Sequence, residues 1–199
     1  MLKFADRMED MRPSDIRVLA QYVNLPGFIS FAGGLPAPEL FPIEDMKTAF
    51  NAMMDEGGRD ALQYDQVRGW MPLRDMLCDR MAKKNGIIGA APENIMLTAG
   101  SQQGIDFIGK LFLNPGDIVL AEGPSYLGAL NCLKAYQCKF VSIPTDEHGP
   151  IIPELEKILQ TTKNIKLSYT IPDFQNPSGR SWSLEQGLFC NSSLDYPCL

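Results

Sequence analysis

The chain has 199 residues, of which 45% are hydrophobic and 21% charged, with a formal net charge of -6. This composition is typical of a globular protein with one sizeable core. The acidic balance, with no basic run longer than Lys83-Lys84, argues against a nucleic-acid partner or an anionic membrane surface. We therefore expect small molecules or other protein chains as partners.

The N-terminus and the cysteines exclude further classes. The first ten residues carry acidic side chains where a signal peptide would need an apolar stretch, and no apolar run approaches membrane-spanning length. We expect a cytoplasmic protein. The five cysteines are odd in number and lack Cys-x-x-Cys spacing, so we expect neither a disulfide framework nor a metal site.

Residues 1–91 predict an N-terminal arm followed by interface or small-domain helices. A short amphipathic helix should begin at Ser14 and end before Pro26-Gly27. The segment 29–36 predicts an extended arm that turns sharply at Gly33-Gly34. Two more helices are expected over residues 42–55 and 72–84, the second ended by Gly86.

From residue 92 the pattern becomes an alternation of strands and helices. Near-continuous apolar strands separated by helices are typical of a parallel sheet covered on both faces. The sequence therefore predicts an α/β fold, with residues 92–180 forming part of a mostly parallel sheet. We expect strands at 95–99, 118–121, 140–143 and 166–171, and helices near 101–113, 125–136 and 151–160.

Residues 181–199 depart from this alternation. No helical periodicity is visible after Glu185 and no further strand and helix follow, which leaves the last expected strand with an open edge. We hypothesise that this atypical tail, after about Glu185, is frame-shifted or misjoined.

The most informative segment is Thr98-Ala-Gly-Ser-Gln-Gln-Gly104, between an expected strand and an expected helix. Gly100 permits a tight turn, and the first-turn N–H groups with the Ser101 hydroxyl would face an anion at the positive end of the helix dipole. The glycine spacing fits neither the dinucleotide fingerprint, nor the P-loop, nor the hydrolase elbow. Taken alone, such a turn is more often a plain helix cap than a ligand site.

Two other segments follow strands and should reach the same edge of the sheet, where open α/β sheets bind ligands. In Glu122-Gly-Pro-Ser-Tyr126, the aromatic ring of Tyr126 could stack on a flat heterocycle. In Pro172–Arg180, Asn176 is held by a Pro-Ser-Gly turn and could bond a ring hydroxyl. By themselves these are an ordinary aromatic side chain and an ordinary Asn-Pro turn.

Considered together, the motifs resemble a known family, the fold-type I, pyridoxal-phosphate-dependent class I aminotransferases of the aminoadipate and kynurenine branch. The resemblance runs from about residue 14 to about residue 185 and implies transfer of an amino group from an α-amino acid to a 2-oxo acid. The matching runs are Phe31-Ala-Gly-Gly-Leu-Pro36, Leu62-Gln-Tyr64, Thr98 to Gly104, Glu122 to Tyr126 and Gln175-Asn-Pro-Ser-Gly179.

The resemblance also implies site residues and the cofactor pyridoxal 5′-phosphate. Gly100, Ser101 and Gln102 would bind the cofactor phosphate, Tyr126 would stack on the pyridine ring, and Asn176 would bond the 3-hydroxyl and contact the substrate. Gly34 would lie beside the substrate carboxylate. Tyr64 would reach the phosphate in the neighbouring subunit of a homodimer.

Other groups that the family needs are missing from this sequence. These are an aspartate for the pyridine nitrogen, a Schiff-base lysine in a Ser-Lys loop, and a C-terminal arginine for the substrate carboxylate. We therefore expect no catalytic residue in this chain, no covalent attachment of the cofactor in the family's manner, and no activity of the chain alone. The alternatives are a non-catalytic fragment that binds the cofactor or pairs with an intact subunit, and a gene remnant that folds poorly.

Overall fold

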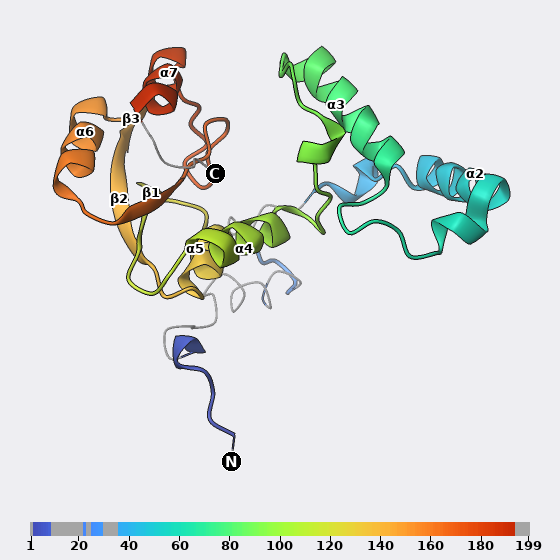
Figure 1. Ribbon diagram of the computed structural model, residues 1–199, viewed down its shortest axis with the longest axis horizontal. Coiled ribbons are helices and arrows are strands. Elements are labelled where there is room, and N and C mark those ends of the chain that lie inside the picture. Colours follow the sequence, from blue (N-terminus) through green and yellow to red (C-terminus); the bar gives the residue numbers. More distant parts are fainter. Residues whose placement is uncertain (1, 9–21, 23–24, 30–35, 194–199) are drawn as a thin grey trace. The chain divides into compact units, whose positions relative to one another are not determined.

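The computed structural model describes every residue except 1, 9–21, 23–24, 30–35 and 194–199 (Figure 1). The chain divides into two compact units, one formed by residues 1–15 with 99–199 and the other by residues 16–98. The expected helix from Ser14 and the arm around Gly34 lie outside the described residues.

The unit of residues 16–98 contains two of the expected helices. Helix α2, Ile43–Ala61, runs past its expected end at residue 55 and is broken locally at Gly57. Helix α3, Met71–Asn85, has a proline in its first turn and ends at Gly86, whose φ of +67° is the left-handed conformation that favours glycine. Short 3₁₀ turns at Pro38–Leu40 and Pro92–Asn94 flank the pair.

The expected strand at 95–99 is wrong. The N–H of Leu97 donates to the carbonyl of Arg68 at 2.9 Å, and the Leu97 side chain packs on Gly69, where an added Cβ would lie 2.5 Å from it. The apolar alternation of this segment is thus satisfied by contact with the turn at 66–69. It pairs with no strand among the described residues.

The sheet lies in the other unit and has the strand order β3-β2-β1-β4. Strand β1, Ile118–Gly123, pairs in parallel with both β2, Lys139–Asp146, and β4, Ile165–Tyr169. The short β3, Gly149–Pro150, is antiparallel to β2 and was not expected. The prediction of a mostly parallel sheet is confirmed, with three of its expected strands in place.

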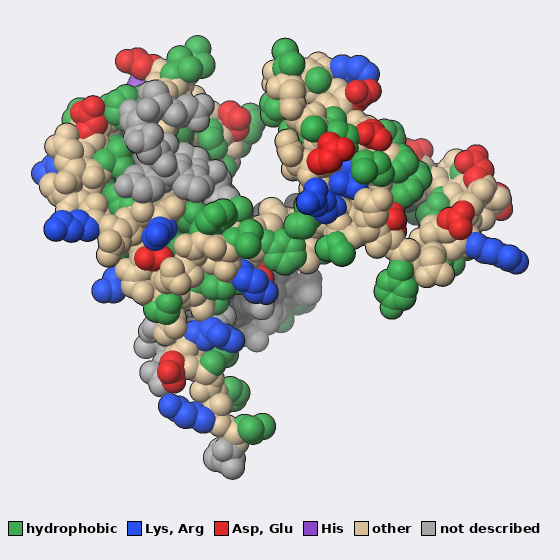
Figure 2. Space-filling view, viewed as in Figure 1, with side chains coloured by type: hydrophobic (Ala, Val, Ile, Leu, Met, Phe, Trp, Pro, Cys, Tyr) green, Lys and Arg blue, Asp and Glu red, His purple; other side chains and the backbone are tan. Residues whose placement is uncertain are grey.

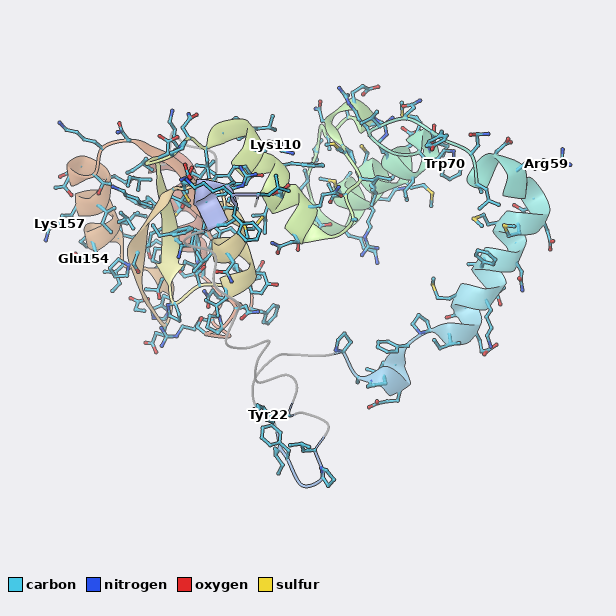
Figure 3. All side chains as sticks on the ribbon, turned by 90° about the horizontal axis from the view of Figure 1, so that it is seen from below. Tyr22, Arg59, Trp70, Lys110, Glu154 and Lys157 are labelled. Atoms are coloured by element: carbon cyan, nitrogen blue, oxygen red, sulfur yellow. The ribbon has the colours of Figure 1, made fainter. Side chains whose placement is uncertain are left out.

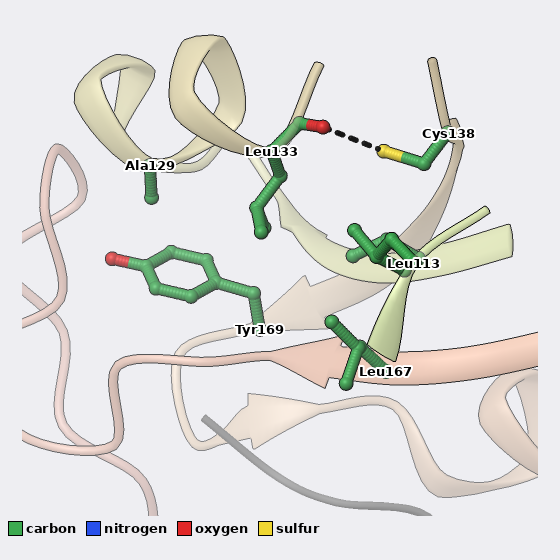
Figure 4. Close-up of a cluster of buried hydrophobic side chains, with 7 residues drawn as sticks. Leu113, Ala129, Leu133, Cys138, Leu167 and Tyr169 are labelled. Carbon is green, nitrogen blue, oxygen red and sulfur yellow. Dashed lines mark hydrogen bonds between the residues drawn. The ribbon is translucent and has the colours of Figure 1, made fainter. Parts of the chain in front are cut away.

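Helices cover both faces of this sheet, as expected (Figure 1). Because side chains alternate along a strand, neighbouring residues of β1 point into different cores. Val119 packs with Leu133 and Leu167 beneath α4, Ser101–Phe112, and α5, Leu127–Lys134 (Figure 4). Leu120 packs on the opposite face with residues of α6, Ile152–Thr161, and α7, Leu184–Ser193.

The expectation that helical structure stops near Glu185 is also wrong. Helix α7 continues to Ser193, and Cys190 within it is only 4% exposed. Cys190 and Phe189 belong to the core on that face of the sheet, as does Trp182 just before the helix. Gly187 and the Asn-Ser-Ser end of α7 have low intrinsic helix propensity, so this helix depends on packing against the sheet.

The distribution of charged side chains on the described surface agrees with the lack of a basic run in the sequence. Figure 2 shows acidic and basic side chains interspersed on the face in view, without a single basic patch. Within the described ranges, no helix is long and apolar enough to cross a membrane.

Candidate cofactor site

The start of α4 presents a helix N-terminus to open space. The helix begins at Ser101, directly after Gly100, whose φ is +79° and which has no atom within 4 Å of an added Cβ. Being glycine, residue 100 offers no side-chain acceptor to the first-turn N–H groups. The turn is closed from behind by Gln103, whose Oε1 accepts the N–H of Ala99 at 2.6 Å. This arrangement suits an anion, because the first N–H groups and the positive end of the helix dipole both face the space in front of Ser101.

Tyr126 lies next to this helix start. The side-chain amide of Gln102 donates to the carbonyl of Gly128 at 3.2 Å. Gly128 in turn lies so close to the Tyr126 ring that an added Cβ would stand 2.5 Å from it. Tyr126 is 37% exposed, so part of its ring remains available for stacking.

Helix α4 is fixed to α5 by a polar cluster. The Tyr136 hydroxyl donates to Asp106 Oδ1 at 2.7 Å, and the Cys132 thiol lies 4.0 Å from the same oxygen. Burial, followed by the hydrogen bond to Asp106, raises the pKa of Tyr136 to about 12. The hydrogen bond thus joins the middle of α4 to the segment that follows α5.

The loop that carries Asn176 is attached to the Tyr126 loop. Buried Gln175 donates through Nε2 to the carbonyl of Pro124 at 2.7 Å, and its Oε1 accepts the N–H of Ser178 at 2.8 Å. Asn176, the next residue, is exposed at the tip of this loop. One side chain thus ties together the segments after β1 and after β4.

Buried Glu122 also joins the end of β1 to the segment that follows β4. From the sequence alone, no role was assigned to this residue. Its Oε2 accepts the N–H of Ile171 at 2.8 Å and its Oε1 accepts the indole N–H of Trp182 at 2.9 Å. Burial raises the pKa of Glu122 above its ordinary value, and the N–H bonds oppose this rise. The available signal was an acidic residue within an apolar strand, four residues before Tyr126.

The sequence-predicted residues are placed as follows. Gly100, Ser101, Gln102, Tyr126 and Asn176 all lie in the sheet-containing unit, on connected loops that follow β1 and β4 and at the start of α4. Tyr64 lies in the unit of residues 16–98, in the turn after α2, with its side chain 99% exposed. Gly34 is outside the described residues.

The donor set of this edge fits pyridoxal 5′-phosphate. A helix N-terminus suits a phosphate, a part-exposed tyrosine suits a flat ring, and an exposed amide suits a ring hydroxyl. In addition, the Ser125 hydroxyl is buried and has no hydrogen-bond partner among the described residues, so one more polar group in the loop before Tyr126 is left for a ligand or water.

The sheet is mostly parallel, is covered by helices on both faces and has polar loops at the carboxyl ends of its strands, which defines an α/β protein of the open-sheet class. Proteins of this class bind ligands at that edge of the sheet. Residues 35–187 match the family described as aminotransferase class I and II. The chain belongs to this family.

Individual relatives agree with this assignment. The chain is 42% identical over 180 residues to aromatic-amino-acid aminotransferase 1 of Thermococcus litoralis, covering 88% of this chain and 43% of that protein. It is 41% identical over 169 residues to a 2-aminoadipate transaminase of Thermus thermophilus, covering 85% of this chain and 41% of that protein. Among solved structures, a Pyrococcus horikoshii kynurenine aminotransferase in complex with PMP matches with a TM-score of 0.88 and 37% identity, over 98% of this chain and 50% of that one. The chain thus spans about half the length of these relatives.

Proposed function

We propose that this chain is the cofactor-binding N-terminal part of a pyridoxal-phosphate-dependent aminotransferase, which transfers an amino group from an α-amino acid to a 2-oxo acid. The observation that supports this best is the link from Gln102 through Gly128 to Tyr126, because it sets a helix N-terminus beside an aromatic ring. When bound, the cofactor supplies an electron-withdrawing ring that stabilises negative charge on the substrate carbon.

The chain's own residues would bind and orient that cofactor. The N–H groups of Ser101 and Gln102, with the Ser101 hydroxyl, would donate to the phosphate. The exposed part of the Tyr126 ring would stack on the pyridine, and Asn176 would bond the ring hydroxyl and contact the substrate. Gly34 would approach the substrate carboxylate.

The positions of the lysines support the proposal that the chain alone does not complete the reaction. Lys139 is the first residue of β2 and Lys166 is near the start of β4, at the end of the sheet opposite the site. Lys110 and Lys134 lie in the last turns of their helices. Lys110 and, on α6, Lys157 point outward from the helices that cover the sheet (Figure 3). None of these amines is placed to attack a cofactor held beside Tyr126.

We extend the proposal to a cytoplasmic homodimer for the whole enzyme. Tyr64 supports the dimer, since an almost fully exposed aromatic side chain is suited to contact with a second chain. In that dimer the Tyr64 hydroxyl would reach the phosphate bound by the other subunit.

Two measurements on the purified chain test the proposal. After mixing with pyridoxal 5′-phosphate and gel filtration, the chain should retain absorbance in the visible band of the cofactor, and Ser101→Ala should retain less. Conversion of 2-oxoglutarate to glutamate with an added amino acid should be undetectable. Loss of all cofactor from the wild-type chain would exclude the binding role, and measurable turnover would exclude the inactivity of the chain alone.

A further inference from the structure

Glu122 connects backbone and side-chain donors that are far apart in the sequence. Ile171 is 49 residues away and Trp182 is 60 residues away, yet each donates an N–H to one oxygen of this carboxylate, at 2.8 and 2.9 Å. Ile171 follows β4 and leads into the loop with Asn176, whereas Glu122 leads into the loop with Tyr126. The carboxylate therefore holds the bases of both loops together.

The chemistry of this contact requires an acceptor with two oxygens. An ionised carboxylate can accept from two N–H groups at once and presents no donor of its own. A glutamine in the same place would turn its NH₂ group toward one of the two N–H donors and leave that donor without a partner. Glu122 is only 4% exposed, so water cannot easily replace the missing acceptor.

A second contact joins the loops nearer their tips. The side-chain amide of Gln175, the residue before Asn176, donates to the carbonyl of Pro124 at 2.7 Å. Pro124 is two residues before Tyr126. The pair of loops is thus bonded at two levels, by Glu122 at the base and by Gln175 higher up. These bonds join the two loop segments that carry Tyr126 and Asn176.

We propose that Glu122 is a positioning residue that keeps Tyr126 and Asn176 at the spacing needed to hold the cofactor ring, with Trp182 as its second anchor. The proposal rests on the proposed function for the identity of the ligand. It assigns no role to Glu122 in phosphate binding, because other contacts hold α4: Gln103 closes the turn before the helix, and Asp106 accepts the Tyr136 hydroxyl.

This separation makes the test specific. The variants are Glu122→Gln, which keeps the size of the side chain, and Trp182→Phe, which removes only the indole N–H donor and part of the ring. Glu156→Gln, an exposed acid on α6, is the matched control. Circular dichroism in the far ultraviolet establishes that each variant is folded, and dissociation constants are then measured for inorganic phosphate and for pyridoxal 5′-phosphate.

We expect Glu122→Gln to bind pyridoxal 5′-phosphate about tenfold more weakly, the effect of one lost charge-assisted hydrogen bond, with phosphate affinity unchanged. Trp182→Phe should show a smaller loss in the same direction, and Glu156→Gln none. An unchanged affinity for pyridoxal 5′-phosphate in Glu122→Gln, or an equal loss for both ligands, would overturn the proposal.

Hydrogen exchange of the ligand-free chain separates this proposal from the proposed function. Peptides covering 123–126 and 171–180 should exchange faster in Glu122→Gln than in wild type, while α4 should not change. If the wild-type chain binds neither ligand, the proposed function fails. Unchanged exchange in the two loops would show that Glu122 does not position them, whatever the ligand affinities are.

Discussion

The side-chain amide of Gln102 donates to the main-chain carbonyl of Gly128, so this glutamine links α4 to α5. Its neighbour Gln103 has a different role, because its Oε1 accepts the N–H of Ala99 and closes the turn before the helix. Gln102 thus serves the contact between the helices, and Gln103 serves the turn before α4. Any contact of Gln102 with a phosphate then comes from its backbone N–H.

Alanine substitutions should separate these two roles. Gln102→Ala should lower the free energy of unfolding by about 1 kcal/mol, the usual effect of one hydrogen bond, with less than a twofold change in phosphate affinity. Gln103→Ala should weaken phosphate binding several-fold, because the turn at Gly100 loses its support. Urea unfolding and phosphate titration of both variants measure the difference. Equal effects of the two substitutions on phosphate binding would argue against the division.

Alanine substitutions at two glycines of α4, Gly109 and Gly104, test how closely α4 packs on α5. An added Cβ at Gly109 would lie 2.6 Å from the Tyr136 ring, whereas one at Gly104 would meet no atom within 4 Å. Gly109→Ala should therefore destabilise the chain by about 1–3 kcal/mol through overpacking. Gly104→Ala should stabilise it by up to about 1 kcal/mol through helix propensity. Urea unfolding tests both signs, and a stabilised Gly109→Ala would show that the two helices are not packed as described.

These contacts also show what the sequence could and could not predict. The strands at 118–121, 140–143 and 166–171 were found because a continuous apolar run between two helices is typical of a buried parallel strand. The run at 95–99 was misassigned, since Leu97 packs on Gly69 and not in the sheet. Glu122 was missed because its partners are 49 and 60 residues away, and no local pattern reports a contact at that distance.

Glu122 should make stability depend on pH in a defined direction. Burial raises its folded-state pKa above the ordinary value of 4.5. A group with a raised folded-state pKa adds stability below its unfolded pKa and loses that contribution as the pH rises through the folded value. The free energy of unfolding of wild type, relative to Glu122→Gln, should therefore increase as the pH falls from about 8 toward 4.5. Urea unfolding of both proteins across this pH range measures their free energies of unfolding. If the value for wild type minus the value for Glu122→Gln decreased as the pH falls, the prediction would be contradicted.

Cys138 should be protected from alkylation in the folded chain. Its thiol is buried and donates to the carbonyl of Leu133 at 3.3 Å (Figure 4), and burial raises its pKa to about 11. Since only the thiolate reacts, about one molecule in a thousand is reactive at this site near pH 8. Mass spectrometry after iodoacetamide treatment should find Cys138 unmodified in the native chain and modified in urea. The half-buried Cys78 on α3 is the internal comparison, and modification of Cys138 at the rate of Cys78 would contradict the burial.

The last prediction concerns the segment that the sequence pattern set apart as an atypical tail. Trp182, Phe189 and Cys190 all pack into the core formed with Leu120 and Leu155. A chain ended at Arg180 would uncover this face of the sheet and also lose the indole donor to Glu122. Removing these two partly buried aromatic side chains together with buried Cys190 should cost roughly 3 kcal/mol or more. The exposed apolar face should bind the dye ANS.

A chain ended at Ser193 retains α7 and is the control for this deletion. It should unfold at the same urea concentration as the full chain and bind no additional dye, because the described core contacts remain. If both shortened chains matched the full chain in stability, α7 would contribute nothing to the core and the segment would be a tail after all. If only the chain ended at Arg180 is destabilised, residues 181–193 are part of the folded unit that carries the loops with Tyr126 and Asn176.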